Sequence, residues 1–115
     1  MLQGLNHITI AVRDLELSFD FYTNTLGMKP RVKWASGAYL TCGELWFCLS
    51  LDNVKPSQDY THIAFSVEES QFSSVRQILI DLQVKEWKTN SSEGDSVYLL
   101  DPDGHKLEIH CGDLT

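Results

Sequence analysis

The stretch "NHITIAVRDLE" (residues 6–16) occurs a second time in the chain, in altered form, as "THIAFSVEESQ" (residues 61–71). Each copy alternates apolar and polar residues like a strand and then continues with the spacing of a helix. The aligned pairs are His7 with His62, Ile8 with Ile63 and Val12 with Val67. Internal duplication of this kind predicts two structural units of the same design.

The residues after each copy complete a matching set of elements. A helix is predicted after each strand, with Asp14 as the N-cap of the first helix and Gly27 at its end. The apolar stripe is Leu15, Phe19, Tyr22 and Leu26 in the first helix and Phe72, Val75, Leu79 and Leu82 in the second. Three strands follow each helix, namely "RVKWA", "GAYLTCG" and "LWFCLSL", then "KEWK", "SVYLLD" and "HKLEIHC". Turn residues separate these strands.

The expected fold class is α+β, with a single domain over residues 1–115 made of two tandem βαβββ modules. Module 1 covers about residues 1–51, residues 52–59 form a polar linker, and module 2 covers about residues 60–113. Each module is expected to present a curved antiparallel sheet. Two such sheets, paired about a pseudo-twofold axis, would form a barrel-like cup into which equivalent residues of the two modules point.

Composition excludes several classes of protein. Hydrophobic residues make up 43% and charged residues 22% of the chain, as in ordinary globular proteins. The formal net charge of −7 argues against nucleic acid as a partner, because phosphate binding requires clustered basic residues. No apolar run approaches the roughly 20 residues of a membrane span. The three cysteines form no CxxC pair, which favours a reducing, cytoplasmic location.

Two histidines and one glutamate are candidate metal ligands. His7 and His62 hold equivalent positions in the repeat, and Glu108 stands in the last strand between two apolar residues. Such a set leaves coordination positions open for water and substrate, and it suits Mn(II), Fe(II), Ni(II) or Zn(II). A strand histidine is more often a surface or hydrogen-bonded core residue, and His105 and His110 are competing candidates. His110 is the harder one to exclude because it shares the strand face of Glu108.

Four ordered stretches match the pattern of a known family: "GLNHITIAV", "GAYLTCGELWFCLS", "DYTHIAFSV" and "NSSEGDSVYLLDPDGHKLEIHCGDL". Over essentially its whole length the chain resembles the vicinal oxygen chelate superfamily, and within it the fosfomycin resistance thiol transferases of the FosA type. The resemblance implies addition of a thiol, usually glutathione, to the epoxide of fosfomycin. It also implies Mn(II) held by His7, His62 and Glu108, and a homodimer in which the modules pair across the two chains.

The resemblance assigns roles to further residues. Thr9 would hydrogen-bond the epoxide oxygen or the phosphonate, and Tyr39 would help to ionise the thiol. The remaining roles are a thiol channel of Trp34, Ser36 and Ser50, an apolar wall at Trp46, phosphonate contacts from Lys88, Ser92 and Tyr98, and a K⁺-binding loop of Asn90, Ser92, Gly94 and Ser96. From the residues alone, Thr9 is equally a strand former, Trp46 a core residue and this loop a simple turn.

Two departures from the family pattern remove positive charge. Family members usually have an arginine directly after the loop asparagine, where this chain has Ser91. They also continue past "GDL" into a segment with another phosphonate-binding arginine, whereas this sequence stops at Thr115. Weaker fosfomycin turnover is therefore expected, with less effect on the fold and on metal binding.

Other functions share this pattern of residues. Glu44, in the turn before Trp46, could activate water for epoxide hydrolysis. Glyoxalase-like isomerases and ring-cleaving dioxygenases have a similar ligand set, and a metal-free relative could simply bind and sequester a drug. The resemblance of the loop at residues 87–98 to a K⁺ site favours the thiol transferase over these alternatives.

Overall fold

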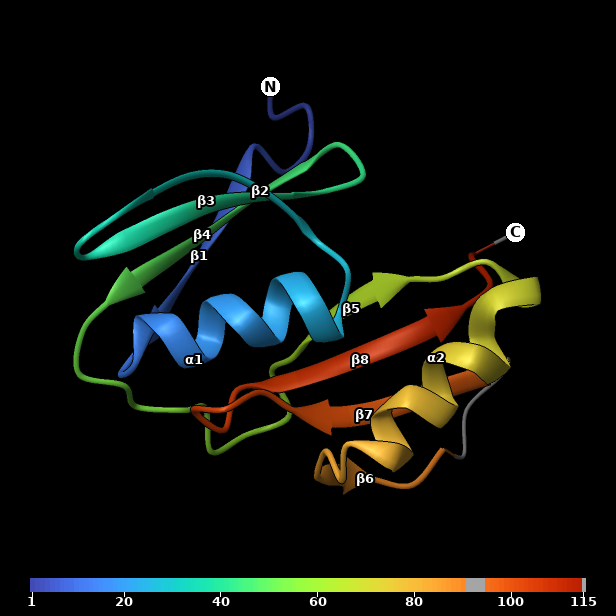
Figure 1. Ribbon diagram of the computed structural model, residues 1–115. Helices are drawn as coiled ribbons and strands as arrows, with labels where there is room; N and C mark the ends of the chain where they lie inside the picture. Colours follow the sequence, from blue (N-terminus) through green and yellow to red (C-terminus); the bar gives the residue numbers. More distant parts are fainter. Residues whose placement is uncertain (91–94, 115) are drawn as a thin grey trace. The chain divides into compact units, whose positions relative to one another are not determined.

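The computed structural model describes residues 1–90 and 95–114 and divides into two compact units, Met1–Lys55 and Pro56–Thr115 (Figure 1). Unit 1 contains β1 (His7–Val12), α1 (Leu15–Asp20), the π-helical turn η1 (Phe21–Thr25), β2 (Lys29–Trp34), β3 (Gly37–Cys42) and β4 (Leu45–Leu51). Unit 2 contains β5 (Ile63–Ser66), α2 (Glu69–Asp81), β6 (Glu86–Lys88), β7 (Asp95–Leu100) and β8 (Lys106–Cys111). The predicted order of elements is confirmed in both halves.

Both sheets have four strands and the same topology, β1-β4-β3-β2 and β5-β8-β7-β6. The prediction of antiparallel sheets is wrong at one position in each unit, because β1 pairs with β4, and β5 with β8, in parallel. A helical crossover lets the strands on either side of it run in the same direction. The two later strands of each unit then fill the space between them, so the first and last strands of a unit become neighbours.

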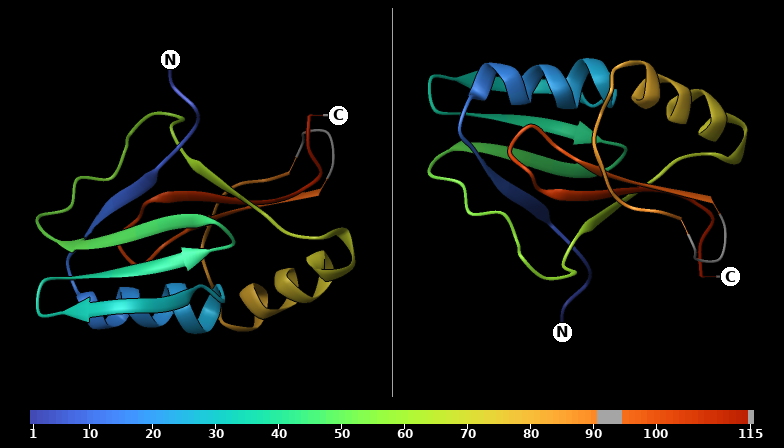
Figure 2. Two further views of the ribbon diagram at one scale, coloured as in Figure 1. Left: turned by 90° about the horizontal axis from the view of Figure 1, so that it is seen from above. Right: turned by 90° about the horizontal axis from the view of Figure 1, so that it is seen from below.

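Helix α1 lies along one face of its sheet (Figures 1 and 2). Asp14 caps it as predicted, since its carboxylate accepts a hydrogen bond from the Leu17 backbone N–H at 3.0 Å. Gly27 ends the helical segment with a φ of 80°, a left-handed conformation that favours glycine. The core of this unit lies between helix and sheet and is formed by Val12, Tyr22, Leu40, Phe47 and Leu49.

Helix α2 covers the corresponding face in unit 2, where Phe72 and Leu79 are buried. A cavity of about 180 Å³ remains beside it, lined by residues such as Leu79, Val97 and Leu99. The sequence pattern predicts Leu82 on the apolar stripe, but Leu82 is 57% exposed, because the helix has already ended there and Gln83 turns the chain with a φ of 56°. None of the helices in the described part of the chain is long and apolar enough to cross a membrane.

Candidate metal centre and substrate face

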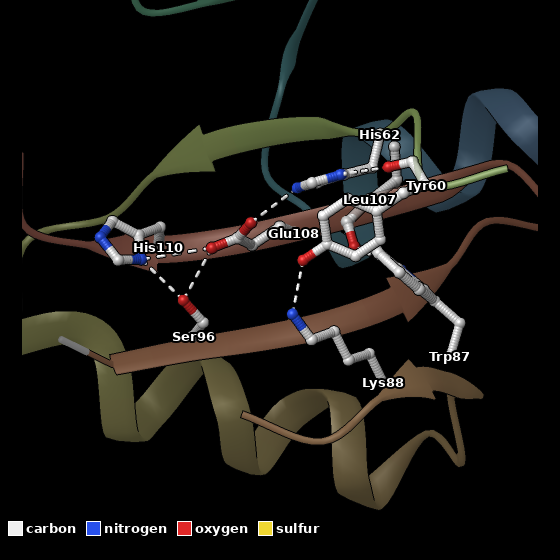
Figure 3. A network of polar contacts seen from close by, with 8 residues as sticks. All are labelled: Tyr60, His62, Trp87, Lys88, Ser96, Leu107, Glu108 and His110. Atoms are coloured by element: carbon white, nitrogen blue, oxygen red, sulfur yellow. Dashed lines mark hydrogen bonds and ion pairs between the residues drawn. The ribbon is translucent and has the colours of Figure 1, made fainter. Parts of the chain in front are cut away.

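The face of the second sheet that points away from α2 holds a connected polar network (Figure 3). Glu108 lies on β8 and is paired with Ala64 of β5 on one side and Tyr98 of β7 on the other. Its Oε1 lies 2.9 Å from Nε2 of His62, the residue just before β5. The structure therefore brings together two of the three predicted metal ligands.

Hydrogen bonding determines which ring nitrogen of His62 is available to bind a metal ion. Nδ1 lies 2.8 Å from the carbonyl oxygen of Tyr60, which can only accept, so Nδ1 bears the proton. In neutral His62, Nε2 then presents a lone pair to a carboxylate oxygen. Two acceptors at this distance require a proton or a metal cation between them.

The donor set fits a divalent metal ion. Two ligand atoms each about 2.1 Å from one ion, and at right angles to each other, are about 3.0 Å apart, close to the separation of these two atoms. A carbonyl that holds the far nitrogen of a ligating histidine is the usual outer support of such sites. His7, in unit 1, has the same arrangement, because its Nδ1 lies 2.7 Å from Oδ1 of Asn6 and Nε2 is left to ligate.

The other oxygen of Glu108 is also engaged. Ser96 of β7 donates its hydroxyl proton to Oε2 at 2.7 Å, and Nδ1 of His110 lies 2.6 Å from that hydroxyl oxygen and 3.2 Å from Oε2. Ser96 and Glu108 are both buried, at 5% and 8% exposure. The carboxylate is thus held on both sides.

A cation lies next to this network. Lys88 of β6 donates a hydrogen bond to the Tyr60 hydroxyl, and its ammonium lies 4.8 Å and 4.7 Å from the ring centres of Tyr60 and Tyr98. The hydrogen bond to Tyr60 is the main cause of a raised Lys88 pKa. The ammonium therefore keeps its charge at any pH near neutrality and can attract an anionic substrate group.

A bulge in β6 places both Trp87 and Lys88 next to the polar network. Glu86 pairs with Leu99 and Lys88 with Tyr98, so Trp87 is an extra residue between the two pairs. The Trp87 ring lies 5.3 Å from that of His62 and 5.2 Å from that of Tyr98, and its indole N–H donates to the Leu107 carbonyl at 2.9 Å. The bulge lets Trp87 and Lys88 both reach the polar network.

The segment before β5 is stabilised by its own hydrogen bonds. The Asp59 carboxylate accepts from the Ser57 hydroxyl at 2.5 Å and from the Thr61 backbone N–H at 2.9 Å, and the pKa of Asp59 is lowered mainly by the first of these. The Lys106 ammonium donates to the Asp59 carbonyl. These contacts hold the segment from which Tyr60 and His62 project.

In unit 1 the face away from α1 displays the remaining predicted residues. His7 pairs with Trp46 across the β1–β4 ladder, and Thr9 and Tyr39 both pair with Cys48, so these side chains share one face. Rings form a row across all four strands: Trp34 to Tyr39 at 4.9 Å, Tyr39 to Trp46 at 5.2 Å and Trp46 to His7 at 4.4 Å. Trp46 is 37% exposed and belongs to this row, not to the core.

The other predicted site residues include two serines of unit 1 and the residues of the predicted K⁺ loop. Ser50 lies on β4 opposite Gly37 and is exposed on the same face as Trp46, and Ser36 is in the exposed turn before β3. Of the predicted K⁺ loop, Asn90 and Ser96 are described, whereas Ser92 and Gly94 lie outside the described residues.

Sequence reasoning missed Tyr60, Trp87 and the contact between Ser96 and His110. The sequence does contain a hint of the two aromatic residues, since both stand within two residues of a predicted site residue. The link from Ser96 to His110 had none, because it depends on the register between β7 and β8.

A second group of metal-binding residue types lies in the turn after β7. One ligand atom from each of Asp101, Asp103 and His105 lies within 4.8 Å of the others. Here Asp101 Oδ1 accepts from the backbone N–H groups of Asp103 at 2.9 Å and His105 at 2.8 Å. These bonds account for the buried position of Asp101 as the organiser of a tight turn.

Two βαβββ units with polar, ligand-bearing open faces define the class of protein. The family model of the Glyoxalase/Bleomycin resistance protein/Dioxygenase superfamily matches residues 4–109, and the chain belongs to this superfamily. Among curated relatives it is 53% identical over 120 residues to the glutathione transferase FosA of Serratia marcescens, with 100% of this chain and 85% of that protein covered. It is 38% identical to the metallothiol transferase FosB of Lysinibacillus sphaericus, with 98% and 85% covered.

Solved structures agree with these similarities. The fosfomycin resistance protein FosX from Listeria monocytogenes superimposes with a TM-score of 0.88 at 26% identity, with 99% of this chain and 97% of that chain covered. A variant of the same protein, complexed with Mn(II) and 1S,2S-dihydroxypropylphosphonic acid, gives the same TM-score and identity, with 99% and 96% covered. The predicted family and fold class are confirmed.

Proposed function

We propose that the protein is a metal-dependent transferase that adds a thiol such as glutathione to the epoxide of fosfomycin and thereby confers resistance. One observation carries the proposal: His62 Nε2 and Glu108 Oε1 lie at a distance that a divalent metal ion can bridge, next to the Lys88 ammonium and on an open face. A divalent cation beside a fixed positive charge suits a small phosphonate that bears a reactive oxygen. The 53% identity to a glutathione transferase over the whole chain supports the thiol as co-substrate.

The metal is proposed to be Mn(II), held by His62 and Glu108 of one unit together with His7. When bound, it would act as a Lewis acid toward the epoxide oxygen. The Listeria structure with Mn(II) supports this choice over the other divalent ions that the ligand set suits. A K⁺ ion bound by Asn90, Ser92, Gly94 and Ser96 is proposed as a further source of positive charge near the phosphonate.

The chain's own residues would divide the remaining work. Lys88, Ser92 and Tyr98 bind the phosphonate, the Thr9 hydroxyl donates to the epoxide oxygen, and Trp46 contacts the methyl end. Tyr39 hydrogen-bonds the thiol, which reaches the site past Trp34, Ser36 and Ser50. The sulfur attacks an epoxide carbon, the carbon–oxygen bond breaks, and the resulting alkoxide takes up the proton that the thiol has lost.

The assembly is proposed to be a homodimer. The metal ligands are divided between the units, with His7 in one and His62 and Glu108 in the other, and the two units are proposed to be modules of one domain joined by residues 52–59. Pairing of modules across two chains would bring His7 to the Glu108 of the partner subunit. A cytoplasmic location is proposed on account of the thiol co-substrate and the three free cysteines.

Hydrolysis is the second candidate, and one observation favours it. The diol bound by the Listeria protein is what addition of water to the fosfomycin epoxide would give. Glu44, the predicted base for that reaction, lies in the exposed turn between β3 and β4. Thiol transfer takes precedence because identity to the glutathione transferase is 53%, against 26% to the Listeria protein.

A thiol-consumption assay tests the proposal. Purified protein is incubated with fosfomycin and glutathione, with Mn(II) or with EDTA, and the free thiol is titrated over time. The proposal predicts consumption that depends on both protein and Mn(II) and that is faster in K⁺ than in Na⁺. Equal consumption with Mn(II) and EDTA would show that the metal has no part in the reaction.

A further inference from the structure

The contacts of Ser96 and His110 with Glu108 have no role in the function proposed above. Glu108 and His110 project from the same face of β8, and Ser96 is the residue of β7 directly opposite His110. Figure 3 shows the hydroxyl of Ser96 in contact with both the imidazole of His110 and the carboxylate of Glu108, which also lie next to each other.

Proton counting gives the direction of these hydrogen bonds. A serine hydroxyl has one proton, and Ser96 donates it to Oε2 of Glu108 at 2.7 Å. The hydroxyl oxygen must then accept at its 2.6 Å contact with His110, so Nδ1 of His110 bears a proton. The chain of donors runs from His110 through Ser96 to Glu108.

This chain fixes the orientation of the Glu108 carboxylate. The last torsion of a glutamate side chain is broad and nearly two-fold, so an unsupported carboxylate rotates readily. Here Oε2 of Glu108 accepts the hydrogen bond from Ser96 and also lies 3.2 Å from Nδ1 of His110. Oε1 is therefore the oxygen that points toward His62. The ligand oxygen is therefore in place before any metal arrives.

We propose that His110 is a positioning residue that acts through Ser96 to hold Glu108 in the orientation required for metal binding. The inference rests on the proposed metal site, but it concerns residues that hold a ligand and not the ligands themselves. Loss of an outer-shell partner typically weakens metal affinity by about 10–100-fold. Because of this positioning role, His110→Ala is not suitable as an inert control for the metal site.

The test measures Mn(II) binding in the absence of fosfomycin and thiol, through the electron paramagnetic resonance signal of free Mn(II). The parent protein is expected to bind Mn(II), and His110→Ala and Ser96→Ala are each expected to raise its Kd by about 10–100-fold. His110→Asn should recover affinity to within about threefold of the parent, because its amide N–H can replace the donor at Nδ1. The neighbouring variant Cys111→Ala is the matched control, since Cys111 points to the other face of β8.

Two further comparisons separate this role from others. The double variant Ser96→Ala/His110→Ala should bind Mn(II) no more weakly than the weaker of the two single variants, because both changes break the same series of hydrogen bonds. In pulsed spectra of bound Mn(II), His110→Ala should keep the same number of coupled nitrogens as the parent. The affinities should follow the same order in tetramethylammonium buffer without K⁺.

Each contrary result has a distinct meaning. If the parent binds Mn(II) and His110→Ala binds within twofold of it, the positioning role is wrong while the proposed function stands. Loss of one coupled nitrogen would make His110 a direct ligand and overturn the inference, and so would failure of His110→Asn to recover affinity. An effect seen only in K⁺ would assign Ser96 to the K⁺ site instead. Absence of Mn(II) binding by the parent would overturn the proposed function and this inference together.

Discussion

Glu108 is the residue where the two halves of the polar network meet. One oxygen lies 2.9 Å from Nε2 of His62, and the other accepts from a buried serine at 2.7 Å. A buried carboxylate costs free energy unless its oxygens are paired, so the three residues around this one, His62, Ser96 and His110, indicate a site and not an incidental contact. The proposed metal binding depends on the orientation of this side chain.

Removal of a ligand should abolish tight metal binding. His62→Ala and Glu108→Ala are each expected to raise the Kd for Mn(II) by at least about a hundredfold, because loss of a ligand should cost more than loss of an outer-shell partner. Equilibrium dialysis with metal analysis measures the effect, and circular dichroism checks that both variants fold. Full metal content in both variants would place the metal elsewhere, with the turn at Asp101, Asp103 and His105 as the next site to test.

Lys88 should control the affinity for the phosphonate. A charge-assisted hydrogen bond is worth about 1.5–3 kcal/mol, so Lys88→Ala is expected to lower kcat/KM for fosfomycin by about tenfold or more. Tyr60→Phe removes the hydroxyl that raises the Lys88 pKa and should have a smaller effect in the same direction. Lys85→Ala, an exposed lysine just before β6, is the matched control. Equal kinetics for Lys88→Ala and Lys85→Ala would contradict the assignment.

At the level of elements, the cap of α1 and the bulge in β6 differ in how far the sequence predicts them. Asp14 three residues before Leu17 is a local signal, and the cap forms as expected. The bulge at Trp87 has no local signal, because it depends on how β6 pairs with β7. The bulge matters more for the site, since it brings an aromatic ring and a cation to the same face.

The Asp14 cap gives a prediction about stability alone. Asp14→Ala is expected to lower the free energy of unfolding by about 1 kcal/mol, because the carboxylate that accepts from the Leu17 N–H is lost. Urea denaturation measures the change, and Lys55→Ala, at an exposed position outside the helices and strands, is the control. A drop no larger than that of Lys55→Ala would show that the cap contributes nothing measurable.

At the scale of the molecule, each unit supplies half of the proposed machinery. Unit 1 bears His7, Thr9 and the row of aromatic rings, and unit 2 bears the carboxylate network and the cation. If the proposed dimer shares its sites between chains, inactive variants should complement each other. An equimolar mixture of His7→Ala and Glu108→Ala protein should recover about a quarter of the parent activity after subunit exchange, since half of the dimers are mixed and each has one intact site. No recovery after verified exchange would place all three ligands within one chain.

The repeat explains why so much of the fold could be predicted. Two copies of the same strand and helix pattern predict the element order, because hydrophobic periodicity and caps are local properties, and they also single out His7 and His62 as candidate ligands. The parallel pairing of β1 with β4 was missed, since strand order depends on contacts between distant residues. For the same reason two contacts of the site could not be inferred: Ser96 reaches Glu108 only through strand register, and the Tyr60 carbonyl reaches His62 only through the turn before β5.

The most direct test of thiol transfer is the identity of the product. Phosphorus-31 nuclear magnetic resonance of fosfomycin incubated with Mn(II)-loaded protein and glutathione distinguishes the thiol adduct from the diol by comparison with authentic standards. Thiol transfer predicts a single new resonance, that of the adduct, which appears only when protein, Mn(II) and glutathione are all present. Formation of the diol at the same rate with and without glutathione, or no change in the fosfomycin resonance, would contradict it.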